Sequence, residues 1–506
     1  MIIPSADILG GATTIGQMLY NRGHRSTYDR WAAVYGATGW DYDSLVPYFE
    51  QVERFIDPIS GQQNGTGHIR MRSRPVNPDP VLLRLQESFN RQGFPNVNPL
   101  ELGNTVGTAF YPIMADGRRT SMINTYIAPV NPFPDRLHLL SHAFIKYVTL
   151  GDQALPNNAV KDPTVSGVAF KHLNNTYTVR ARREVILSAN AYSAFPMLFL
   201  VGIGPAELVT RLGVPLVANT SEAFGANIQD HPVVTMYYTV QNESLFSEEI
   251  GPTVQQLFDF YVRQSGPLTE HPHLGAYFGV PNGDPNEDLT VPNGLITASV
   301  EVIPRNLTEL VSRYDPYQAE KWRRYFEPVA GRRVLALSAS LMRPYSTGTI
   351  GMFSQDPYDF QVYNTNYLWD RRDRVAFTEI LRKMFALTEE ASFAQYAQPL
   401  PGPIPACERL YCLGGVPLST CTPYLNCLIG QIGRSSYHLV GSLRVGGPGR
   451  EDAVLDPRLR VKGVKGLRVI DGSMMPEIPN SGTLAAVLMI GEKGAQMVLE
   501  DQQSRS

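Results

Sequence analysis

The residues best suited to chemistry lie in the last seventy residues of the 506-residue chain. His438 comes first, and a neutral imidazole can take a proton from a hydroxyl group because its pKa lies near the working pH of most enzymes. A β-branched run at 467–470 is typical of a buried strand, and residues 471–473 predict a turn. Apolar residues then recur at helical spacing over 483–499, which predicts a helix.

This order of strand, turn and helix could build a ligand site at one edge of a sheet. Ligands of open α/β sheets bind outside the carboxyl ends of the strands. A helix capped by Thr483 would point its free backbone N–H groups back toward the strand end, where they attract anionic or electron-rich groups. A cofactor-sized group could therefore lie between His438 and Thr483. On spacing alone, an ordinary buried strand–helix connection and a core histidine are the favoured interpretations.

The order and identity of the residues in this region favour a ligand site instead. Segments 437–442, 454–461 and 466–476 resemble, in the same order, the C-terminal signature of the glucose–methanol–choline (GMC) oxidoreductases, which are FAD-dependent enzymes. The resemblance implies that His438 is the catalytic base, which removes a hydroxyl proton while a hydride moves to the flavin. It also implies cofactor contacts from Asp471, Gly472, Gly482 and Thr483.

A second resemblance lies near the N-terminus. Residues 9–23 are similar to the second family signature, Gly-Gly-Ser-Ser-x-x-Asn-x-Met-x-Tyr-x-Arg-Gly, which wraps the flavin. It implies cofactor contacts from Gly10, Gly11 and Ala12, whereas a glycine pair before a helix is by itself more often a turn. Gly16 replaces the Asn of the family, so one polar flavin contact is expected to be lost.

Two internal segments match the family as well. Residues 224–232 resemble the element Val-Gly-x-Asn-Leu-x-Asp-His-Pro. The adjacent Asp230 and His231 could suggest catalysis, but a structural hydrogen-bonded pair is the favoured role. A strand like 144–148 borders the adenine in the family, which implies a backbone contact from Val148.

The chain departs from the family pattern in two places that bear on activity. The family has a βαβ unit with Gly-x-Gly-x-x-Gly before the second signature, and this unit binds the ADP half of FAD. The chain begins about where that unit should have ended, which predicts an N-terminally truncated protein or gene record, or else a natural fragment that lost the FAD site. Gly482 occupies the slot of the second active-site residue, His or Asn, and cannot hydrogen-bond a substrate through a side chain. Asn480 or Ser481 could substitute from a shifted backbone, which is the less favoured alternative.

The expected fold class is α/β plus α+β, in two intertwined domains. A GMC-type FAD-binding domain that lacks its first βαβ unit is expected over 1–60, 138–235 and 433–506. A substrate-binding domain with an antiparallel sheet is expected over 61–137 and 236–432. The residue patterns predict a helix at 372–387, a strand at 185–188 that enters a helix, and further strands at 137–140, 144–148, 168–170, 177–179, 335–341 and 349–352.

Composition limits the partners. Apolar residues make up 43% and charged residues 18% of the chain, as in globular proteins. A net charge of -3 provides no basic surface for nucleic acid, and no apolar run is long enough to span a bilayer. The resemblance implies a small-molecule alcohol or sugar as substrate and leaves the electron acceptor unknown. No metal site is expected.

Cysteines and glycosylation sequons bear on the compartment. The four cysteines lack the spacing of a zinc site, so one or two local disulfides are favoured over free thiols: Cys407, Cys412, Cys421 and Cys427. Many arthropod members of the family carry similar cysteines before the catalytic histidine, which implies a glucose-dehydrogenase-like or choline-dehydrogenase-like relative. No signal peptide follows Met1, but a secreted protein is expected from five sequons, at Asn64, Asn174, Asn219, Asn242 and Asn306.

Two functional hypotheses follow. The first is an FAD-dependent oxidoreductase that acts on the CH–OH group of an alcohol, sugar or choline-like donor, with His438 as base. The alternative is a degenerate family member without catalysis that serves as a binding or structural protein. Gly16, Gly482 and the missing Gly-rich unit favour the alternative, whereas the long collinear match around His438 favours the enzyme. The sequence does not separate an oxidase from a dehydrogenase.

Overall fold

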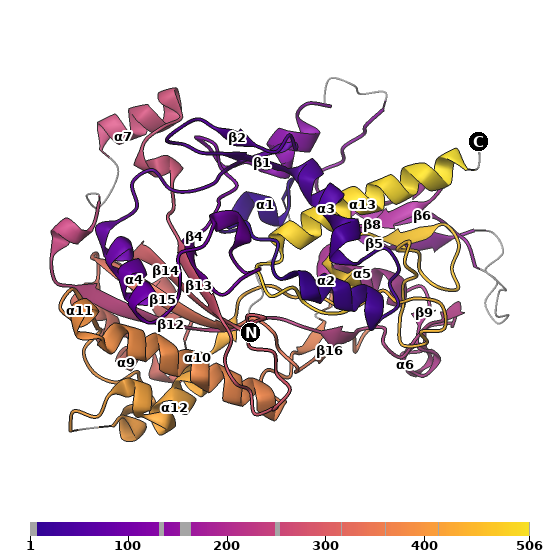
Figure 1. Ribbon diagram of the computed structural model, residues 1–506. Helices are drawn as coiled ribbons and strands as arrows, with labels where there is room; N and C mark the ends of the chain where they lie inside the picture. Colours follow the sequence, from indigo (N-terminus) through magenta and orange to yellow (C-terminus); the bar gives the residue numbers. More distant parts are fainter. Residues whose placement is uncertain are drawn as a thin grey trace.

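The computed structural model describes residues 8–130, 136–151, 163–247, 253–314, 316–359, 361–412 and 414–504. Two bodies lie side by side in Figure 1. One is built on a broad antiparallel sheet with the orange helices beside it, and the other surrounds the yellow C-terminal helix. Each body has its own large cluster of buried apolar side chains. The cluster of the second body draws on both ends of the chain, so the chain crosses between the bodies more than once.

The first body is organised by a sheet that has seven strands among the described residues, all paired antiparallel. The strand order is β18-β12-β15-β14-β13-β4, and β19 also pairs with β12. These strands are β4 (Gly107–Phe110), β12 (Pro232–Val240), β13 (Leu274–Phe278), β14 (Gly294–Val302), β15 (Arg333–Leu341), β18 (Ala397–Pro399) and β19 (Arg434–Ser435). The expected antiparallel sheet and its strand at 335–341 are confirmed.

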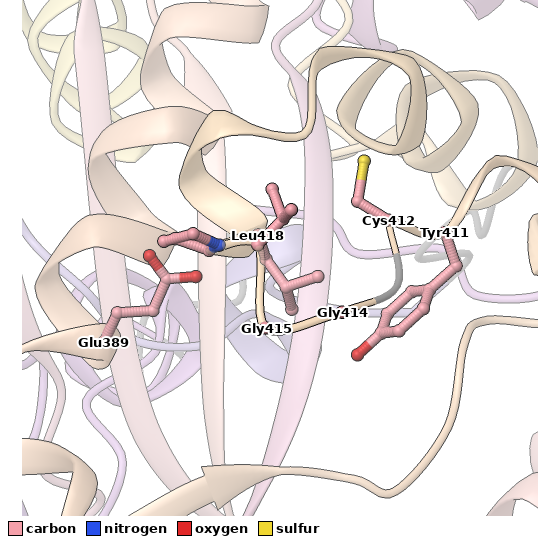
Figure 2. Close-up of a pocket in the computed structure, with 8 residues that line it drawn as sticks. Glu389, Tyr411, Cys412, Gly414, Gly415 and Leu418 are labelled. Atoms are coloured by element: carbon pink, nitrogen blue, oxygen red, sulfur yellow. The ribbon is translucent and has the colours of Figure 1, made fainter.

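Two nested disulfides close a loop of the first body. Cys407 pairs with Cys427, and Cys412 pairs with Cys421, which confirms the expected local disulfides. A shallow pocket lies against this loop and is lined in part by Glu389 (Figure 2). The Glu389 carboxylate already accepts hydrogen bonds from the backbone N–H and the hydroxyl of Ser419. The pocket contains none of the predicted site residues.

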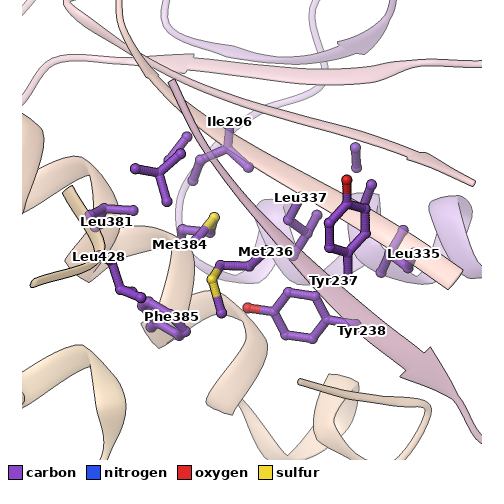
Figure 3. Close-up of a cluster of buried hydrophobic side chains, with 14 of the residues drawn as sticks. Met236, Tyr237, Tyr238, Ile296, Leu335, Leu337, Leu381, Met384, Phe385 and Leu428 are labelled. Carbon is purple, nitrogen blue, oxygen red and sulfur yellow. The ribbon is translucent and has the colours of Figure 1, made fainter. Parts of the chain in front are cut away.

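The sheet packs its apolar side chains against two helices, α10 (Arg371–Glu389) and α12 (Thr422–Ile432). The helix expected at 372–387 is confirmed, and Asp370 caps it by accepting the backbone N–H of Arg372 at 2.8 Å. Side chains three and four residues apart along α10 face the sheet, because they share one side of a helix. Figure 3 shows this core, which includes Met236, Ile296, Leu337, Met384, Phe385 and Leu428.

The second body contains the predicted strand–turn–helix. Strands β8 (Val185–Leu187) and β20 (Leu467–Val469) form a parallel pair. Helix α5 (Asn190–Phe199) follows β8, and β20 leads through a short 3-10 turn, η10 (Gly472–Met474), toward α13 (Leu484–Gln503). All three residues of β20 are buried, and the charged Arg468 among them is paired with Glu184 and Asp501. The predictions for 467–499 and for a strand that enters a helix after residue 185 are confirmed.

A three-stranded sheet completes this body, with the order β5 (Ala143–Leu150), β6 (Val165–His172) and β7 (Asn175–Arg180). It confirms the strand at 144–148 and the hairpin, in which Phe170 pairs with Tyr177. The strand predicted at 137–140 is wrong: these residues are exposed and belong to no strand. Their alternation of apolar residues finds no neighbouring strand to pair with, and alternation alone does not make a strand.

The other elements connect or cover these bodies. No helix of the described residues has the length and apolarity needed to cross a membrane. The prediction at 349–352 is confirmed by β16, which lies between β11 and β17. These elements are α1 (Ala12–Ile15), α2 (Arg25–Ala33), α3 (Tyr42–Val52), β1 (Glu53–Ile56), β2 (Gln63–Asn64), β3 (Ile69–Arg72), α4 (Pro80–Arg91), π-helix η2 (Ile123–Ile127), β9 (Ile203–Gly204), α6 (Ala206–Arg211), β10 (Ala218–Asn219), β11 (Ala226–Ile228), α7 (Val254–Phe258), π-helix η4 (Asp259–Arg263), α8 (Thr308–Val311), α9 (Ala319–Phe326), β16 (Gly348–Gly351), β17 (Val362–Asn364) and α11 (Ala391–Ala394).

Candidate active site

Two segments far apart in the sequence run antiparallel and carry the histidines of the site. Strand β19 pairs with the start of β12, and further along Gln229 and Val440 exchange both of their backbone hydrogen bonds. Between these two points the ladder opens, so that Asp230 and His231 on one arm face residues 436–439 on the other. This irregular opening brings His231 and His438 together.

The carboxylate of Asp230 fills the opening. Its Oδ1 atom accepts the backbone N–H groups of His231 and His438, each at 2.8 Å. Its Oδ2 atom accepts the hydroxyl groups of Ser435 and Tyr367. The predicted hydrogen-bonded pair of Asp230 and His231 is confirmed, through the backbone. The hydrogen bond that the same carboxylate accepts from His438 was not predicted.

The imidazole of His438 is suited to act as a base. Burial lowers its pKa below the ordinary value, and the negative charge of Asp230 acts in the opposite direction. The ring is therefore neutral near pH 7, although the residue keeps partial exposure. A side-chain Cβ placed on Gly482 would stand 3.7 Å from Nε2 of His438, and outside the local chain it would meet no atom within 4 Å other than this ring. The Nε2 atom thus faces open space beside Gly482.

The two proposed substitutes for the missing second residue do not take its place. The side-chain oxygen of Asn480 accepts the backbone N–H of His24 at 2.5 Å, and its amide nitrogen donates to two backbone carbonyls, of Gly103 and Pro292. Asn480 is fully buried and committed to these contacts. The hydroxyl of Ser481 donates to the carbonyl of Gly482 at 3.1 Å. The idea that Asn480 substitutes is therefore wrong, because its hydrogen bonds anchor the loop instead.

This loop also depends on a glycine of the second signature. Gly23 has a φ of +80°, and a Cβ at this position would approach the Ser481 hydroxyl to 2.9 Å. A larger residue would be strained by both the dihedral and the contact. The second signature thus supports the loop that faces His438, a role that the sequence analysis did not consider.

Thr483 occupies the N-cap position of α13, but its side chain accepts no hydrogen bond from the helix. The expected cap is wrong in this respect, because Thr483 adopts a helical conformation, whereas capping residues are extended. The first turn of α13 therefore keeps backbone N–H groups without a side-chain cap. Such groups suit an electron-rich ligand at the helix N-terminus.

Asp471 joins the carboxyl ends of β8 and β20. Its carboxylate accepts the backbone N–H of Ala189 at 2.9 Å and that of Ser473 at 2.8 Å. Burial raises the pKa of Asp471, and these hydrogen bonds oppose the shift. The next residue, Gly472, accepts the backbone N–H of Gly441 at 3.1 Å, which ties the turn to the His438 segment. The 471–473 turn is therefore hydrogen-bonded to the segment that carries His438.

The glycine pair before α1 adopts left-handed backbone dihedrals. The φ angles of Gly10 and Gly11 are +85° and +54°. A Cβ on Gly11 would meet no atom within 4 Å, and Ala12 begins the short helix. Gly10 packs against η2, and Tyr126 of η2 donates a hydrogen bond to Glu492 of α13. The pair is thus connected through η2 to the helix that follows the His438 site.

Val148 lies elsewhere, fully buried in β5 and opposite Val168 of β6. The structure does not join it to the His438 cluster.

The described residues fit an FAD group. Three observations support this fit: left-handed glycines at 10 and 11, an uncapped first turn of α13, and open space at Gly482 beside a neutral imidazole. The residues that would hold the cofactor are Gly10, Gly11 and Ala12, together with the backbone of 471–473 and of Thr483.

Comparison with known proteins agrees with this geometry. An ecdysone oxidase of Bombyx mori is 25% identical over 523 residues, which cover 98% of this chain and 70% of the relative. An oxygen-dependent choline dehydrogenase of Brucella canis is 26% identical over 505 residues, covering 99% of this chain and 82% of the relative.

Two solved structures share the fold. Formate oxidase of Aspergillus oryzae superposes with a TM-score of 0.79 at 21% identity, covering 98% of this chain and 84% of that one. A fungal aryl-alcohol oxidase superposes with a TM-score of 0.70 at 19% identity, covering 99% and 86%. The N-terminal and C-terminal regions that define GMC oxidoreductases match residues 1–233 and 344–491. The chain therefore belongs to the GMC oxidoreductase family of FAD-dependent enzymes, with an FAD-binding and a substrate domain.

Proposed function

We propose that this protein oxidises a CH–OH group of a small-molecule alcohol or sugar, with Nε2 of His438 as the proton acceptor. One observation carries the proposal: a neutral imidazole directs Nε2 into open space beside Gly482, next to the uncapped end of α13. The substrate hydroxyl would lose its proton to Nε2, and its carbon would lose a hydride. Bound FAD would supply the acceptor for that hydride.

The protein contributes position and charge to this step. Proton transfer makes His438 cationic, and the nearby Asp230 carboxylate favours that cation. Gly482 offers no side-chain donor to the substrate oxygen. A missing preorganised donor commonly costs about 10²–10³ in rate, so we expect slow turnover rather than none. This slow-enzyme proposal differs from the alternative of a non-catalytic protein, which predicts no turnover.

Two further parts of the proposal concern the group of relatives within the family and the extent of the FAD-binding domain. The cysteine-rich loop ahead of His438 and the Bombyx mori relative support a member of the arthropod group, and a glucose-dehydrogenase-like relationship stays a prediction. The division into an FAD-binding domain over 1–60, 138–235 and 433–506 and a substrate domain over the rest stays a prediction. That a Gly-rich unit precedes Met1 also stays a prediction, and transcript sequence upstream of Met1 would test it.

The function is tested by anaerobic reduction of the bound flavin. The full natural protein, loaded with FAD, would be mixed with a panel of donors that includes an ecdysteroid, choline, an aryl alcohol and sugars. Bleaching of the flavin by at least one donor, and its loss in His438→Ala, supports the proposal. A flavin-loaded, folded protein that no alcohol reduces would contradict it and favour the non-catalytic alternative.

We also propose that the protein is secreted. Two disulfides form in the described residues, and all five sequon asparagines are exposed. Disulfides persist in oxidising compartments. Expression in secretory cells should give a medium fraction whose gel mobility increases after enzymatic removal of N-glycans. Retention of unglycosylated protein inside the cells would contradict this assignment.

A further inference from the structure

The imidazoles of His231 and His438 contact each other directly. Their Nδ1 atoms lie 3.0 Å apart, and the rings meet edge to face at 81° with centroids 5.1 Å apart. His231 is fully buried, whereas His438 keeps open space at its other nitrogen, Nε2. A contact of this length between two ring nitrogens is a hydrogen bond only if one of them carries a proton.

The direction of this hydrogen bond decides whether His438 can act as a base. If His438 donates from Nδ1, its Nε2 atom has a free lone pair toward the open space. If His231 donates instead, a neutral His438 must carry its proton on Nε2, and it cannot accept another proton there. The hydrogen bond at one nitrogen of a histidine thus sets the chemistry at the other.

The surroundings of His231 favour the first arrangement. Burial, and then the neighbouring His438, keep the pKa of His231 well below its ordinary value, so this ring is neutral and has one proton. The backbone groups of Met342 and Pro479 act in the opposite direction and raise the pKa of His231. Among the described residues, the Nε2 atom of His231 has no hydrogen-bond partner. Because Nδ1 of His231 faces Nδ1 of His438, a proton of His231 on Nε2 leaves Nδ1 free to accept from His438.

We propose that His231 is a positioning residue, whose Nδ1 accepts the Nδ1 proton of His438 and so keeps the Nε2 lone pair of His438 aimed at the space beside Gly482. The arrangement deepens the proposed alcohol oxidation and rests on it for its catalytic meaning. It also gives the cation formed on proton transfer a neutral acceptor for its second N–H. Asp230 supplies the negative charge near this pair.

The hydrogen-bond direction can be measured without a substrate. Long-range ¹H–¹⁵N spectra of the full-length protein, with ¹⁵N in the histidine rings, distinguish the two neutral tautomers of each histidine. Spectra of His231→Asn and His438→Asn assign the two signals. We expect His438 to carry its proton on Nδ1 and His231 on Nε2 between pH 7 and pH 8. The reverse pattern would overturn the proposal.

A pair of variants then separates positioning from mere packing. In His231→Asn the amide oxygen can stand near the place of Nδ1 and accept the same proton, whereas His231→Leu has no acceptor. We expect His231→Leu to lose about 10- to 100-fold in kcat with KM nearly unchanged, and His231→Asn to recover most of this loss. The acid limb of the kcat profile should move to lower pH in His231→Leu only, because the His438 cation loses an acceptor.

The matched control is His273→Asn, which replaces a buried histidine that contacts His271. It should leave kcat and the acid limb unchanged. Equal losses in His231→Leu and His231→Asn, or no loss in either, would overturn the positioning role. If the tautomers are as expected but no donor reduces the flavin, the proposed function fails while the hydrogen-bond direction stands. If the flavin is reduced but the tautomers are reversed, only the inference about His231 fails.

Discussion

The Oδ1 atom of Asp230 lies 2.8 Å from the backbone nitrogen of His438, across 208 residues of sequence. The same oxygen accepts the backbone N–H of His231, so one carboxylate fixes both histidine-bearing arms. Its other oxygen accepts two hydroxyl groups. The side chain is buried, as are His231 and Ser435, so the donors of these two residues cannot readily turn to water instead.

Asp230→Ala should destabilise the protein by about 3 kcal/mol or more, because each buried donor left without an acceptor costs about 1–3 kcal/mol. Asp230→Asn keeps one acceptor oxygen and should cost less. Denaturant unfolding measures both. A loss below about 1 kcal/mol in Asp230→Ala would show that water or another group replaces the carboxylate.

Asp230→Asn should also change the pH dependence of turnover. The Asp230 charge raises the pKa of His438, and burial lowers it. Loss of the charge should therefore lower this pKa further, so that the base stays neutral in more acidic solution. The acid limb of the kcat profile is expected to move to lower pH than in the natural protein. Movement toward higher pH would contradict the assignment of that limb to His438.

Gly482→Asn should increase activity. The backbone at Gly482 is not in the left-handed region, and a Cβ would sit at ordinary contact distance from His438. An amide there could donate to the substrate oxygen, which is worth up to about 10²–10³ in kcat for a well-placed donor. Steady-state kinetics should show kcat at least about tenfold above that of the natural protein. Gly482→Ala, which adds the Cβ without a donor, is the control and should show no such gain.

The buried Arg468 predicts an acid-sensitive contribution to stability. Arg468 pairs with Glu184 at 2.7 Å and with Asp501. Burial alone would raise the pKa of Asp501, but Arg460 and Arg468 hold it well below its usual range. A carboxylate with a depressed folded pKa stabilises the protein above its unfolded pKa of about 3.9, and this contribution is lost as pH falls toward the folded value.

Asp501→Asn should therefore destabilise the protein by about 2–3 kcal/mol at pH 7. This gap in the free energy of unfolding between the natural protein and the variant should narrow below about pH 4. Thermal or denaturant unfolding at several pH values measures the gap. Asp43→Asn is the control, since its exposed pair with Arg25 should be worth at most about 1 kcal/mol. A gap for Asp501→Asn that is constant with pH would contradict the ion-pair explanation.

The inner disulfide should stabilise the first body without affecting the His438 site. Cys412 and Cys421 close a loop with a sequence separation of 9, for which loop-closure entropy gives about 3 kcal/mol. The double variant Cys412→Ala/Cys421→Ala should unfold at a lower temperature but keep its flavin and its kcat under native conditions. A change in kcat would connect this loop to catalysis and contradict the separation of the two sites.

Elements that depend on local pattern could be predicted from the sequence. The strand–turn–helix that ends in α13 and the helix at 372–387 follow from periodicity within each segment. The strand at 137–140 failed because pairing depends on a partner elsewhere in the chain. The commitment of Asn480 could not be predicted, since its partners Gly103 and Pro292 are 377 and 188 residues away. The contact of His231 with His438, 207 residues apart, appears only when the two arms pair.

In the proposed reaction the imidazole of His438 removes the substrate proton, and the rest of the site binds FAD. Anaerobic stopped-flow mixing of FAD-loaded His438→Ala and natural protein with the best donor of the panel tests it most directly. Both proteins should bind flavin equally, and the rate of flavin bleaching should fall by about 10²–10⁴ in the variant. Bleaching at the same rate in both proteins would contradict it.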